Sequence, residues 1–346
     1  MKIGIDISPL SSGHKVRGVG AYVSLLKNNI EKFDGENKYV FFEGKPPSGL
    51  DLVHYPYFDP FFPVLPFSKK TKTIVTVHDL TPIKFREHFP SGVKGNLRWQ
   101  YNRFLLKKSD GIIVDSNASK KDVVKIIGFN EDRVKSVYLG SDPIYKKIRL
   151  SDGVRDEVKK RYSIGDNFMI YVGDVTWNKN LPRIVSAVKK VGIEFLLIGK
   201  SIADDNFDAS NPWSKDRVEL RRMIKGDEKI KVLGFVPDED LSKIYNMAQG
   251  LLMPSLYEGF GLPVLEAMSC GCPVITSREG SLPEVGGDAV LYADALSVES
   301  IEEKIKELMT NKKLRDELSE KGLLQAKKFS IEKMIKDTLD VYKTFG

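Results

Sequence analysis

Residues 253–277 read MPSLYEGFGLPVLEAMSCGCPVITS, and this stretch decides the fold expected for the chain. The apolar run 250–253 that leads into it predicts a short buried strand. A glycine-rich loop follows over 255–261, and Pro263 stands where a first helical turn tolerates proline. A second apolar run over 273–276 predicts the next strand. In this strand–loop–helix–strand unit, backbone N–H groups and the helix dipole favour an anion such as a diphosphate beside the loop.

Two carboxylates flank the glycine-rich turn of this stretch. Glu258 lies in the loop, and Glu266 follows eight positions later in the predicted first turn of the helix. An acid at that place is often only a favourable helix N-terminal charge, and for Glu266 alone this interpretation has even odds. A carboxylate can also accept hydrogen bonds from sugar or ribose hydroxyls. The pair therefore suggests a nucleotide-sugar site.

The pattern PS-x-x-EGFGLP-x-LEAM-x-x-G-x-PV resembles the E-x7-E element of retaining glycosyltransferases of the GT-B fold, especially glycosyltransferase family 4. In that family the first Glu faces the donor sugar and the second holds the ribose, which implies those roles for Glu258 and Glu266. The resemblance also implies that the neighbouring loop residues contact the donor: Gly259, Phe260, Gly261 and Leu262.

Length and composition limit the number of domains and the classes of protein that this chain can belong to. A chain of 346 residues exceeds what one core usually supports, so two domains are expected. The only two cysteines, Cys270 and Cys272, are too few for a disulfide framework or a four-ligand zinc site. No apolar run is long enough for a signal peptide or a membrane span. We therefore expect a cytoplasmic protein.

The charge is unevenly spread along the chain. Residues 1–150 hold 25 Lys and Arg against 15 Asp and Glu, whereas the remainder holds 29 against 32. A basic half can indicate nucleic acid, an anionic membrane surface or an acidic substrate. No nucleic-acid-binding signature accompanies it, so we expect no nucleic acid. A solvated surface and contact with anionic lipid or a lipid-diphosphate acceptor both stay open.

Gly18 and Gly20 lie between a strand predicted over 2–7 and a helix predicted over 21–32. The full three-glycine spacing of a dinucleotide-binding loop is absent, so a tight strand-to-helix turn is an equally good interpretation. The segment RGVGAY resembles the family's first glycine-rich loop, which lies over the donor phosphates and the acceptor. This resemblance implies donor contacts for Gly18 and Gly20.

His78 follows the strand predicted over 72–77, at a carboxyl end where open α/β sheets bind ligands. A histidine satisfied by the neighbouring Asp79 is the structural alternative. The segment VHDLTP resembles the family's histidine-bearing loop, which implies that His78 lies near the donor sugar and acceptor. Ser116 follows the strand predicted over 111–114, and a helix cap is its expected role.

Residues 55–67, YPYFDPFFPVLPF, contain four prolines and many aromatics, so they predict neither a helix nor a central strand. Their apolar side chains either pack against their own domain or form an acceptor groove or a bilayer contact. The second interpretation gains support from Lys69, Lys70 and Lys72 next to them.

The loop GDVTWNKNLP follows a strand predicted over 168–172 and precedes a helix from about residue 181. By resemblance Lys179 neutralises the donor diphosphate, and Gly173 and Asn178 line the donor site. A solvated lysine at a helix start is the alternative interpretation of Lys179.

The chain departs from the family where an arginine usually accompanies this lysine, because Asn178 or Asp174 stands there. More of the diphosphate charge would then fall to the loop N–H groups, or to Arg17 or Arg183 arriving from elsewhere. The same resemblance places the donor base near Phe235 and Val236. The nearby Asp238-Glu239-Asp240 matches a metal-binding D-x-D pattern, but favourable charges at a helix start explain it better.

Together these features predict the α/β class and the GT-B fold, two facing doubly wound Rossmann-like domains with a C-terminal helix crossing back to the first. We expect an acceptor-side domain over 1–165, a nucleotide-sugar donor domain over 166–328 and the returning helix over 329–346. The catalytic residues implied are His78, Lys179 and Glu258.

The resemblance implies a retaining glycosyltransferase that moves a sugar from a nucleotide diphosphate donor to a hydroxyl of a glycan or lipid-linked acceptor. The first donor expected is GDP-mannose, as in bacterial mannosyltransferases of polysaccharide and O-antigen assembly. A UDP-sugar transferase, a nucleotide-sugar 2-epimerase and an inactive sugar-nucleotide binding protein are the alternatives. No cofactor and no metal are expected, and contact with an anionic membrane would be peripheral.

Overall fold

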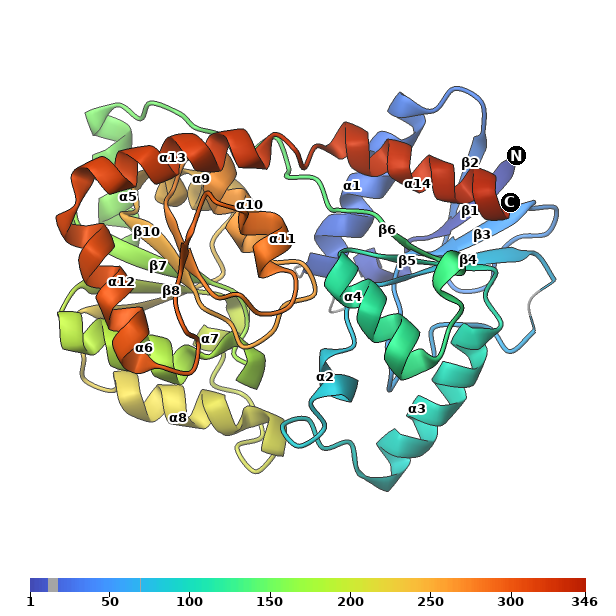
Figure 1. Ribbon diagram of the computed structural model, residues 1–346, viewed down its shortest axis with the longest axis horizontal. Coiled ribbons are helices and arrows are strands. Elements are labelled where there is room, and N and C mark those ends of the chain that lie inside the picture. The colour runs from blue at the N-terminus through green and yellow to red at the C-terminus, as the bar shows by residue number, and fades with distance from the viewer. Residues whose placement is uncertain (12–17, 69) are drawn as a thin grey trace. The chain divides into compact units, whose positions relative to one another are not determined.

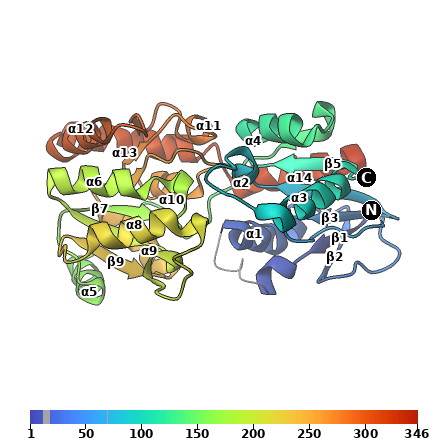
Figure 2. The same cartoon turned by 90° about the horizontal axis from the view of Figure 1, so that it is seen from below.

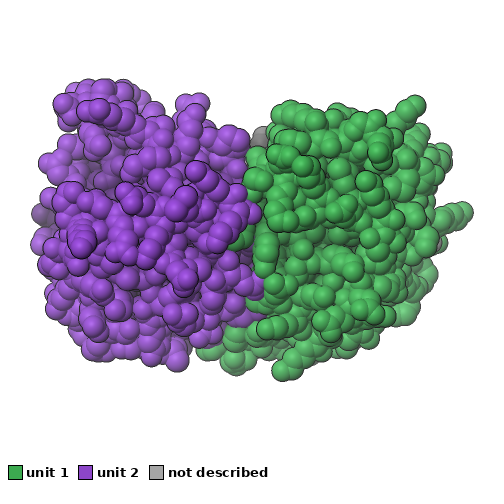
Figure 3. Space-filling view, turned by 45° about the horizontal axis from the view of Figure 1, so that its top comes forward, with its two compact units in different colours: residues 1–140, 329–346 green, residues 141–328 purple. Residues whose placement is uncertain are grey.

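The structure, a computed structural model, describes residues 1–11, 18–68 and 70–346 (Figure 1). Arg17 and Lys69, considered above, lie outside these residues. The chain divides into two compact units (Figure 3). Unit 1 comprises Met1–Gly140 and Phe329–Gly346, and unit 2 comprises Ser141–Lys328.

Unit 1 is built on a six-stranded sheet in the order β2-β1-β3-β4-β5-β6, in which every neighbouring pair is parallel. The strands are β1 (Lys2–Asp6), β2 (Lys38–Phe42), β3 (Leu52–Tyr55), β4 (Lys72–Val77), β5 (Gly111–Val114) and β6 (Val134–Ser136). The helices are α1 (Gly18–Phe33), α2 (Thr81–Lys84), α3 (Gly92–Lys107), α4 (Asn117–Asp122) and α14 (Ile331–Phe345), with short turns η1 (Ser8–Ser11), η2 (Val123–Ile127) and η3 (Glu131–Arg133).

Helices cover both faces of this sheet, as a parallel sheet requires. One face packs Val53, Val75 and Ile112 against Trp99 and Leu105 of α3, within the apolar core of the unit. The alternating residues face α1 and α14, as a strand's period of two dictates. There the buried His54 bonds Tyr342 Oη of α14 at 2.7 Å and Thr76 Oγ1 at 2.8 Å.

Unit 2 repeats the plan with six parallel strands in the order β12-β11-β10-β7-β8-β9. The strands are β7 (Phe168–Val172), β8 (Glu194–Ile198), β9 (Ile230–Gly234), β10 (Gly250–Met253), β11 (Val274–Thr276) and β12 (Leu291–Tyr292). The helices are α5 (Asp152–Tyr162), α6 (Leu181–Val191), α7 (Lys200–Ala203), α8 (Lys215–Ile224), α9 (Asp238–Met247), α10 (Leu262–Ser269), α11 (Leu282–Gly286), α12 (Val298–Thr310) and α13 (Lys312–Ala326), with turns η4 (Trp177–Lys179) and η5 (Pro212–Ser214).

The core of unit 2 lies between its sheet and the helices on either side (Figure 2). Apolar residues of α6, α8 and α12 pack on one face with Tyr171 and Leu197, while α9 and α10 cover the other. The predicted α/β class with two doubly wound, Rossmann-like units and a C-terminal helix is thus confirmed.

Two boundaries differ from those expected. Unit 1 ends at Gly140 rather than near residue 165, because helix α5 joins unit 2, where Arg161 and Tyr162 bond Asp240 of α9. The charged segment around α5 carries no strand signal, so the sequence did not show that it already belonged to the second unit. Gly18 and Gly20 lie in the first turn of α1 rather than in a loop before it.

No helix in the described ranges 1–11, 18–68 and 70–346 is both long enough and apolar enough to cross a bilayer.

Candidate functional site

Most of the predicted donor residues lie in unit 2, on the loops that follow β7 and β10 and in α10. These strands are parallel neighbours, with Gly250 paired to Met169, so both loops leave the sheet at the same edge. Ligands of open α/β sheets bind beyond this carboxyl edge.

The centre of this edge is an ion pair between Lys179 and Glu258. The Lys179 ammonium lies 2.9 Å and 2.8 Å from the two carboxylate oxygens of Glu258. Both side chains are largely shielded, with 19% of Lys179 and 8% of Glu258 exposed. Because the residues are 79 positions apart, only the fold brings them together. Lys179 is therefore not the solvated lysine of the alternative interpretation.

Two asparagines hold the loops in this position. Asn178 donates its side-chain amide to the Tyr257 carbonyl at 3.0 Å, and its own carbonyl accepts from Leu256 N–H at 2.7 Å. Asn180 has a left-handed backbone with φ 60°, which asparagine tolerates better than most residues. Its buried amide donates to the carbonyls of Pro254 at 2.9 Å and Ala295 at 2.7 Å. Asn178, one of the two residues that stand where an arginine is common, thus joins the two loops.

Gly280 and Ser281 contact the backbone of the Glu258 loop. The Ser281 N–H donates to the Glu258 carbonyl at 3.1 Å, and the Ser281 hydroxyl lies 2.7 Å from the Phe260 carbonyl. Gly280 adopts φ +61°, and a Cβ there would overlap the Glu258 carbonyl and lie 2.9 Å from its nitrogen. Only the fold shows that this glycine packs against Glu258.

We expect Gly280→Ala to displace the Glu258 loop, because both the left-handed backbone and the close approach exclude a side chain. The free energy of unfolding should fall by about 2 kcal/mol, and thermal unfolding checks this. The matched control is Gly226→Ala, since Gly226 also has a positive φ of 73° but no atom lies within 4 Å of its missing Cβ. The prediction fails if the two variants lose stability equally.

The glycine-rich turn leads directly into α10. Gly261 has φ 96° and precedes Leu262, the first residue of the helix, and as a glycine it supplies no side-chain cap. Phe260 is buried, and the turn keeps backbone close to the edge of the sheet. The positive end of the helix dipole makes this an electropositive position.

Glu266 is the fifth residue of α10, and no acidic residue occupies the first turn. The expectation of a first-turn charge is therefore wrong, because α10 begins one turn earlier than a helix-terminal acid would need. The Tyr245 hydroxyl of α9 donates to Glu266 at 3.2 Å. Burial raises the pKa of Glu266 to about 8, and the nearby Asp238 and Asp142 add to the shift while the Tyr245 bond opposes it.

Three further predicted donor residues lie at the same edge of unit 2. Gly173 follows β7 with φ 151°, and its N–H donates to the Ile198 carbonyl at 2.9 Å. After β9, Phe235 is 58% exposed whereas Val236 is 3% exposed. Of the two residues predicted to contact the base, only Phe235 has an accessible side chain in this structure.

In unit 1, His78 lies at the end of β4 and makes contacts through both ring nitrogens. Its Nδ1 is 2.7 Å from Asp115 Oδ2, and its Nε2 is 3.2 Å from the Pro56 carbonyl oxygen. Asp115 directly follows β5 and is 37 positions away, whereas the neighbouring Asp79 accepts from Thr81 N–H. The expected structural partner, Asp79, is therefore replaced by Asp115.

Since a carboxylate and a carbonyl are both acceptors, these two contacts together favour the doubly protonated ring. Burial by itself would lower the pKa of His78, but the charge and hydrogen bond of Asp115 outweigh it and raise the pKa. Tyr22 of α1 sets its ring edge-on to His78 at a centroid distance of 5.0 Å. The second carboxylate oxygen of Asp115 is buried and has no hydrogen-bond partner among the described residues.

The remaining predicted residues have other surroundings. Nothing among the described residues lies within 4 Å of the missing Cβ of Gly18, so the start of α1 has open space beside it. Ser116 caps α4 by accepting from Ser119 N–H at 3.0 Å, as predicted. Asp240, in the D-x-D segment, pairs with Arg161 at 2.7 Å and Lys243 at 2.8 Å.

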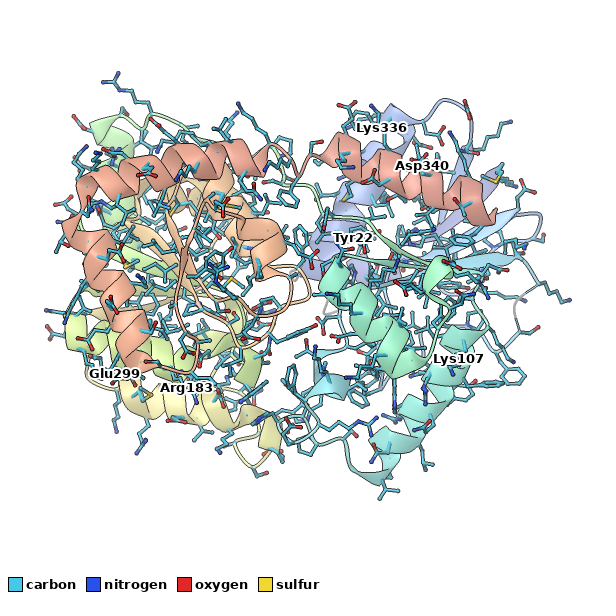
Figure 4. All side chains as sticks on the ribbon, in the orientation of Figure 1. Tyr22, Lys107, Arg183, Glu299, Lys336 and Asp340 are labelled. Carbon is cyan, nitrogen blue, oxygen red and sulfur yellow. The ribbon has the colours of Figure 1, made fainter. Side chains whose placement is uncertain are left out.

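No cluster of three metal-ligating side chains occurs within the parts of the chain that the structure describes. Arg183, one candidate for the missing positive charge, bonds the Asn180 side chain at 3.0 Å (Figure 4). Arg183 therefore supports the β7–α6 loop.

Comparison with known proteins identifies the family of this chain. Residues 154–325 match the family model of glycosyl transferases group 1, and residues 21–144 match that of Glycosyltransferase Family 4. The O-antigen chain mannosyltransferase B of Escherichia coli is 31% identical over 298 residues, which cover 85% of this chain and 75% of that protein. The chain belongs to the group 1 glycosyl transferases.

Two further relatives of this group 1 glycosyl transferase bear on its fold and length. A serotype-specific mannosyltransferase of Escherichia coli is 26% identical over 268 residues, but the match spans only 32% of that longer protein. The crystal structure of Anabaena HepE in complex with UDP and glucose has a TM-score of 0.75 at 16% identity, covering 99% of this chain and 100% of that one. This likeness supports the GT-B fold and no finer statement.

Proposed function

We propose that this protein is a retaining glycosyltransferase that moves mannose from GDP-mannose to a hydroxyl of a glycan or lipid-linked acceptor. The names of its relatives support the sugar, since O-antigen chain mannosyltransferase B is 31% identical to it. The observation that carries the proposal is the shielded pair of Lys179 with Glu258, which lies on the loop that leads into α10. It combines a cation, a carboxylate and backbone donors at one edge of a sheet.

A sugar nucleotide has a group that can bind the cation, a group that can bind the carboxylate and a group that can bind the backbone donors. The diphosphate would take Lys179 and the N–H groups around Gly259 and Gly261, and it would loosen the hold of Lys179 on Glu258. The Glu258 carboxylate would then accept hydrogen bonds from the sugar hydroxyls. Glu266 would accept from the ribose hydroxyls after losing its proton.

In the reaction proposed, the bond between the anomeric carbon and the diphosphate oxygen breaks through an oxocarbenium-like state. The acceptor oxygen forms its bond on the same face of the sugar, and its proton leaves with the diphosphate. Lys179 and the backbone N–H groups stabilise the charge that develops on the leaving group, which is where electrostatic catalysis has its largest effect. Glu258 orients the sugar and is not assigned a covalent role.

His78 is proposed to contact the sugar or the acceptor hydroxyl. The 3.2 Å contact between its Nε2 and the Pro56 carbonyl is long, so this N–H can be redirected to a ligand hydroxyl. Asp115 keeps the ring protonated and oriented through Nδ1.

The residues that stand where the family usually has an arginine indicate a diphosphate site with less positive charge. Asp174 accepts from the Ser201 hydroxyl at 2.8 Å, and Asn178 bonds within its own loop and to Tyr257. Neither neutralises a phosphate. We expect that Lys179 and backbone donors suffice without a metal ion, so EDTA should leave turnover unchanged.

Nucleotide-induced stabilisation tests the donor. A ligand that binds only the folded state raises its stability by RT ln(1 + [L]/Kd), so thermal unfolding with GDP, UDP and ADP identifies the base. We expect the largest shift with GDP, whereas a larger shift with UDP would favour a UDP-sugar transferase. Stabilisation with no turnover against any acceptor would favour an inactive binding protein. Conversion of the donor sugar without an acceptor would favour a 2-epimerase.

The proton on Glu266 predicts a pH dependence of donor binding. Because its pKa is raised to about 8, ionisation of Glu266 should strengthen nucleoside diphosphate binding as the pH rises. Affinity should increase by up to about 90-fold between about pH 6 and pH 9, since the ionised fraction increases by about that factor. Calorimetric titration of the wild type and Glu266→Gln checks this. An equal pH dependence in the two proteins would contradict the role of Glu266.

The raised pKa of Glu266 also determines how the stability of the ligand-free protein changes with pH. Glu266 is protonated in the folded state and ionised in the unfolded state between about pH 4.5 and pH 8. Its contribution to stability is therefore full below about pH 4.5 and is lost as the pH rises through about 8. Glu266→Gln should lack this part of the pH dependence.

A further inference from the structure

Helix α3 of unit 1 presents an apolar stripe to solvent. Val93, Leu97, Tyr101 and Phe104 are all exposed, by 78%, 68%, 45% and 51%. At 3.6 residues per turn they fall within roughly 80° of the helix circumference. The opposite side of α3 is buried in the core of the unit, so this stripe is a second apolar face.

The loop before β4 enlarges the stripe. Asn102 of α3 donates to the carbonyls of Pro60 at 3.1 Å and Phe62 at 3.0 Å, which fixes the loop against the helix. Phe58 and Leu65 are buried, whereas Phe62 and Phe67 are exposed by 62% and 64%. The apolar loop predicted from the sequence is thus partly core and partly surface. We call Phe62, Phe67, Val93, Leu97, Tyr101 and Phe104 the α3 patch.

Cations border the α3 patch on both sides. Arg98 lies 5.8 Å from the ring centroid of Phe62, and Lys108 lies 4.8 Å from that of Phe67 and 4.2 Å from that of Phe104. Lys94 is exposed on one flank, and Lys107 is exposed near the end of the helix (Figure 4). No acidic residue occurs between Glu87 and Asp110.

Helix α14 of unit 1, in contrast, balances its charges. On α14, Lys333 pairs with Asp337 at 2.8 Å and Lys336 pairs with Glu332. Such pairs one turn apart are what a solvated helix face shows. α3 carries Lys94, Arg98, Arg103 and Lys107 without one acid. Its charge is therefore complementary to an anionic surface.

An anionic bilayer satisfies both properties of the patch. A contiguous exposed apolar area marks an interaction site. A helix with aromatic and aliphatic residues on one side and Lys and Arg beside them lies in the headgroup region, with the apolar side in the acyl boundary. A second copy of this basic helix would instead bring like charges together.

We propose that the α3 patch docks unit 1 on anionic lipid membranes. The inference does not depend on the nucleotide-sugar site, because the patch residues belong to unit 1 and to none of the donor loops. The membrane contact expected from the basic first half of the chain is thereby assigned to one helix and the loop packed on it.

Vesicle co-sedimentation tests the proposal with the full chain and no nucleotide. The wild type should bind vesicles that contain phosphatidylglycerol and should not bind phosphatidylcholine alone. Lys94→Ser with Arg98→Ser should weaken binding by about 30-fold, taking a factor of about 5 for each cation near a membrane. Phe67→Ser with Leu97→Ser should weaken it by about tenfold or more.

Matched surface variants of unit 2 serve as controls. Leu296→Ser with Leu324→Ser removes two apolar residues exposed by 67% and 64%, close to the 68% of Leu97 and the 64% of Phe67. Lys225→Ser with Lys313→Ser removes two exposed lysines. Both control pairs should leave vesicle binding unchanged, and equal losses in test and control pairs would overturn the assignment to α3.

A gain-of-signal variant keeps the fold intact. Leu97→Trp places an indole on the patch, and its fluorescence should shift to the blue with phosphatidylglycerol vesicles only. An unshifted spectrum overturns the proposal. So does a patch-dependent dimer in solution, dispersed by Phe67→Ser with Leu97→Ser while vesicle binding persists, because the α3 patch would then be a protein interface.

Discussion

Lys179→Met is expected to lower kcat/KM for sugar transfer by about 1,000-fold, because one preorganised positive donor to the leaving diphosphate is lost. It should also lower the free energy of unfolding by about 3 kcal/mol, since the shielded Glu258 carboxylate would lose its partner. Thermal and denaturant unfolding give the stability, and GDP release from GDP-mannose gives the activity.

The double variant Lys179→Met with Glu258→Gln separates these two effects. It removes the unpaired charge and should regain most of the lost stability, while activity stays at the level of the single variant or below. Lys189→Met, which removes an exposed lysine of the following helix α6 that pairs with Asp227 at 3.2 Å, should change stability little and leave the activity unchanged. Recovery of activity in the double variant would show that Lys179 acts only by neutralising Glu258.

Asp115→Asn is expected to lower the activity by about 100-fold while the hydrogen bond to His78 Nδ1 can still form. The charge is what changes. In the wild type the pKa of His78 should lie above its ordinary value of about 6.5. In the variant only Asp79 and the Pro56 carbonyl oppose the effect of burial, so the pKa of His78 should be lower than in the wild type. Imidazole proton resonances followed against pH measure both values, with His78→Asn assigning the signal.

Protonation of His78 also makes the stability of the folded protein depend on pH. Because the folded-state pKa is raised, the stabilisation from protonated His78 is full below about 6.5 and is lost as the pH rises through the folded value. Asp115→Asn should remove this loss, and Asp132→Asn, an exposed acid of the same unit, should retain it. An unchanged His78 pKa in Asp115→Asn would contradict the pairing.

Local sequence was sufficient for the elements that frame the site. The apolar run 168–172 and the strand β7 coincide, and the helix expected from about residue 181 is α6, which begins at Leu181. These segments have a clear period and distinct ends, so local patterns decide them. Gly18 and Gly20 were less well placed, because glycine permits both a loop and the first turn of α1.

Pairings between distant residues could not be predicted in this way. Lys179 and Glu258 were each identified, but their contact follows from the parallel pairing of β7 with β10. His78 was identified beside Asp79, yet the pairing of β4 with β5 brings Asp115 to it instead. Motifs name the residues at a strand end, and only the sheet order determines which ends are neighbours.

The most direct test of the diphosphate site is calorimetric binding of GDP and GMP to the wild type and to Lys179→Ala. If Lys179 and the backbone around Gly259 and Gly261 hold the diphosphate, the wild type should prefer GDP strongly. Lys179→Ala should then lose far more affinity for GDP than for GMP. Equal affinities of the wild type for the two nucleotides, or equal losses in the variant, would contradict the proposed donor site.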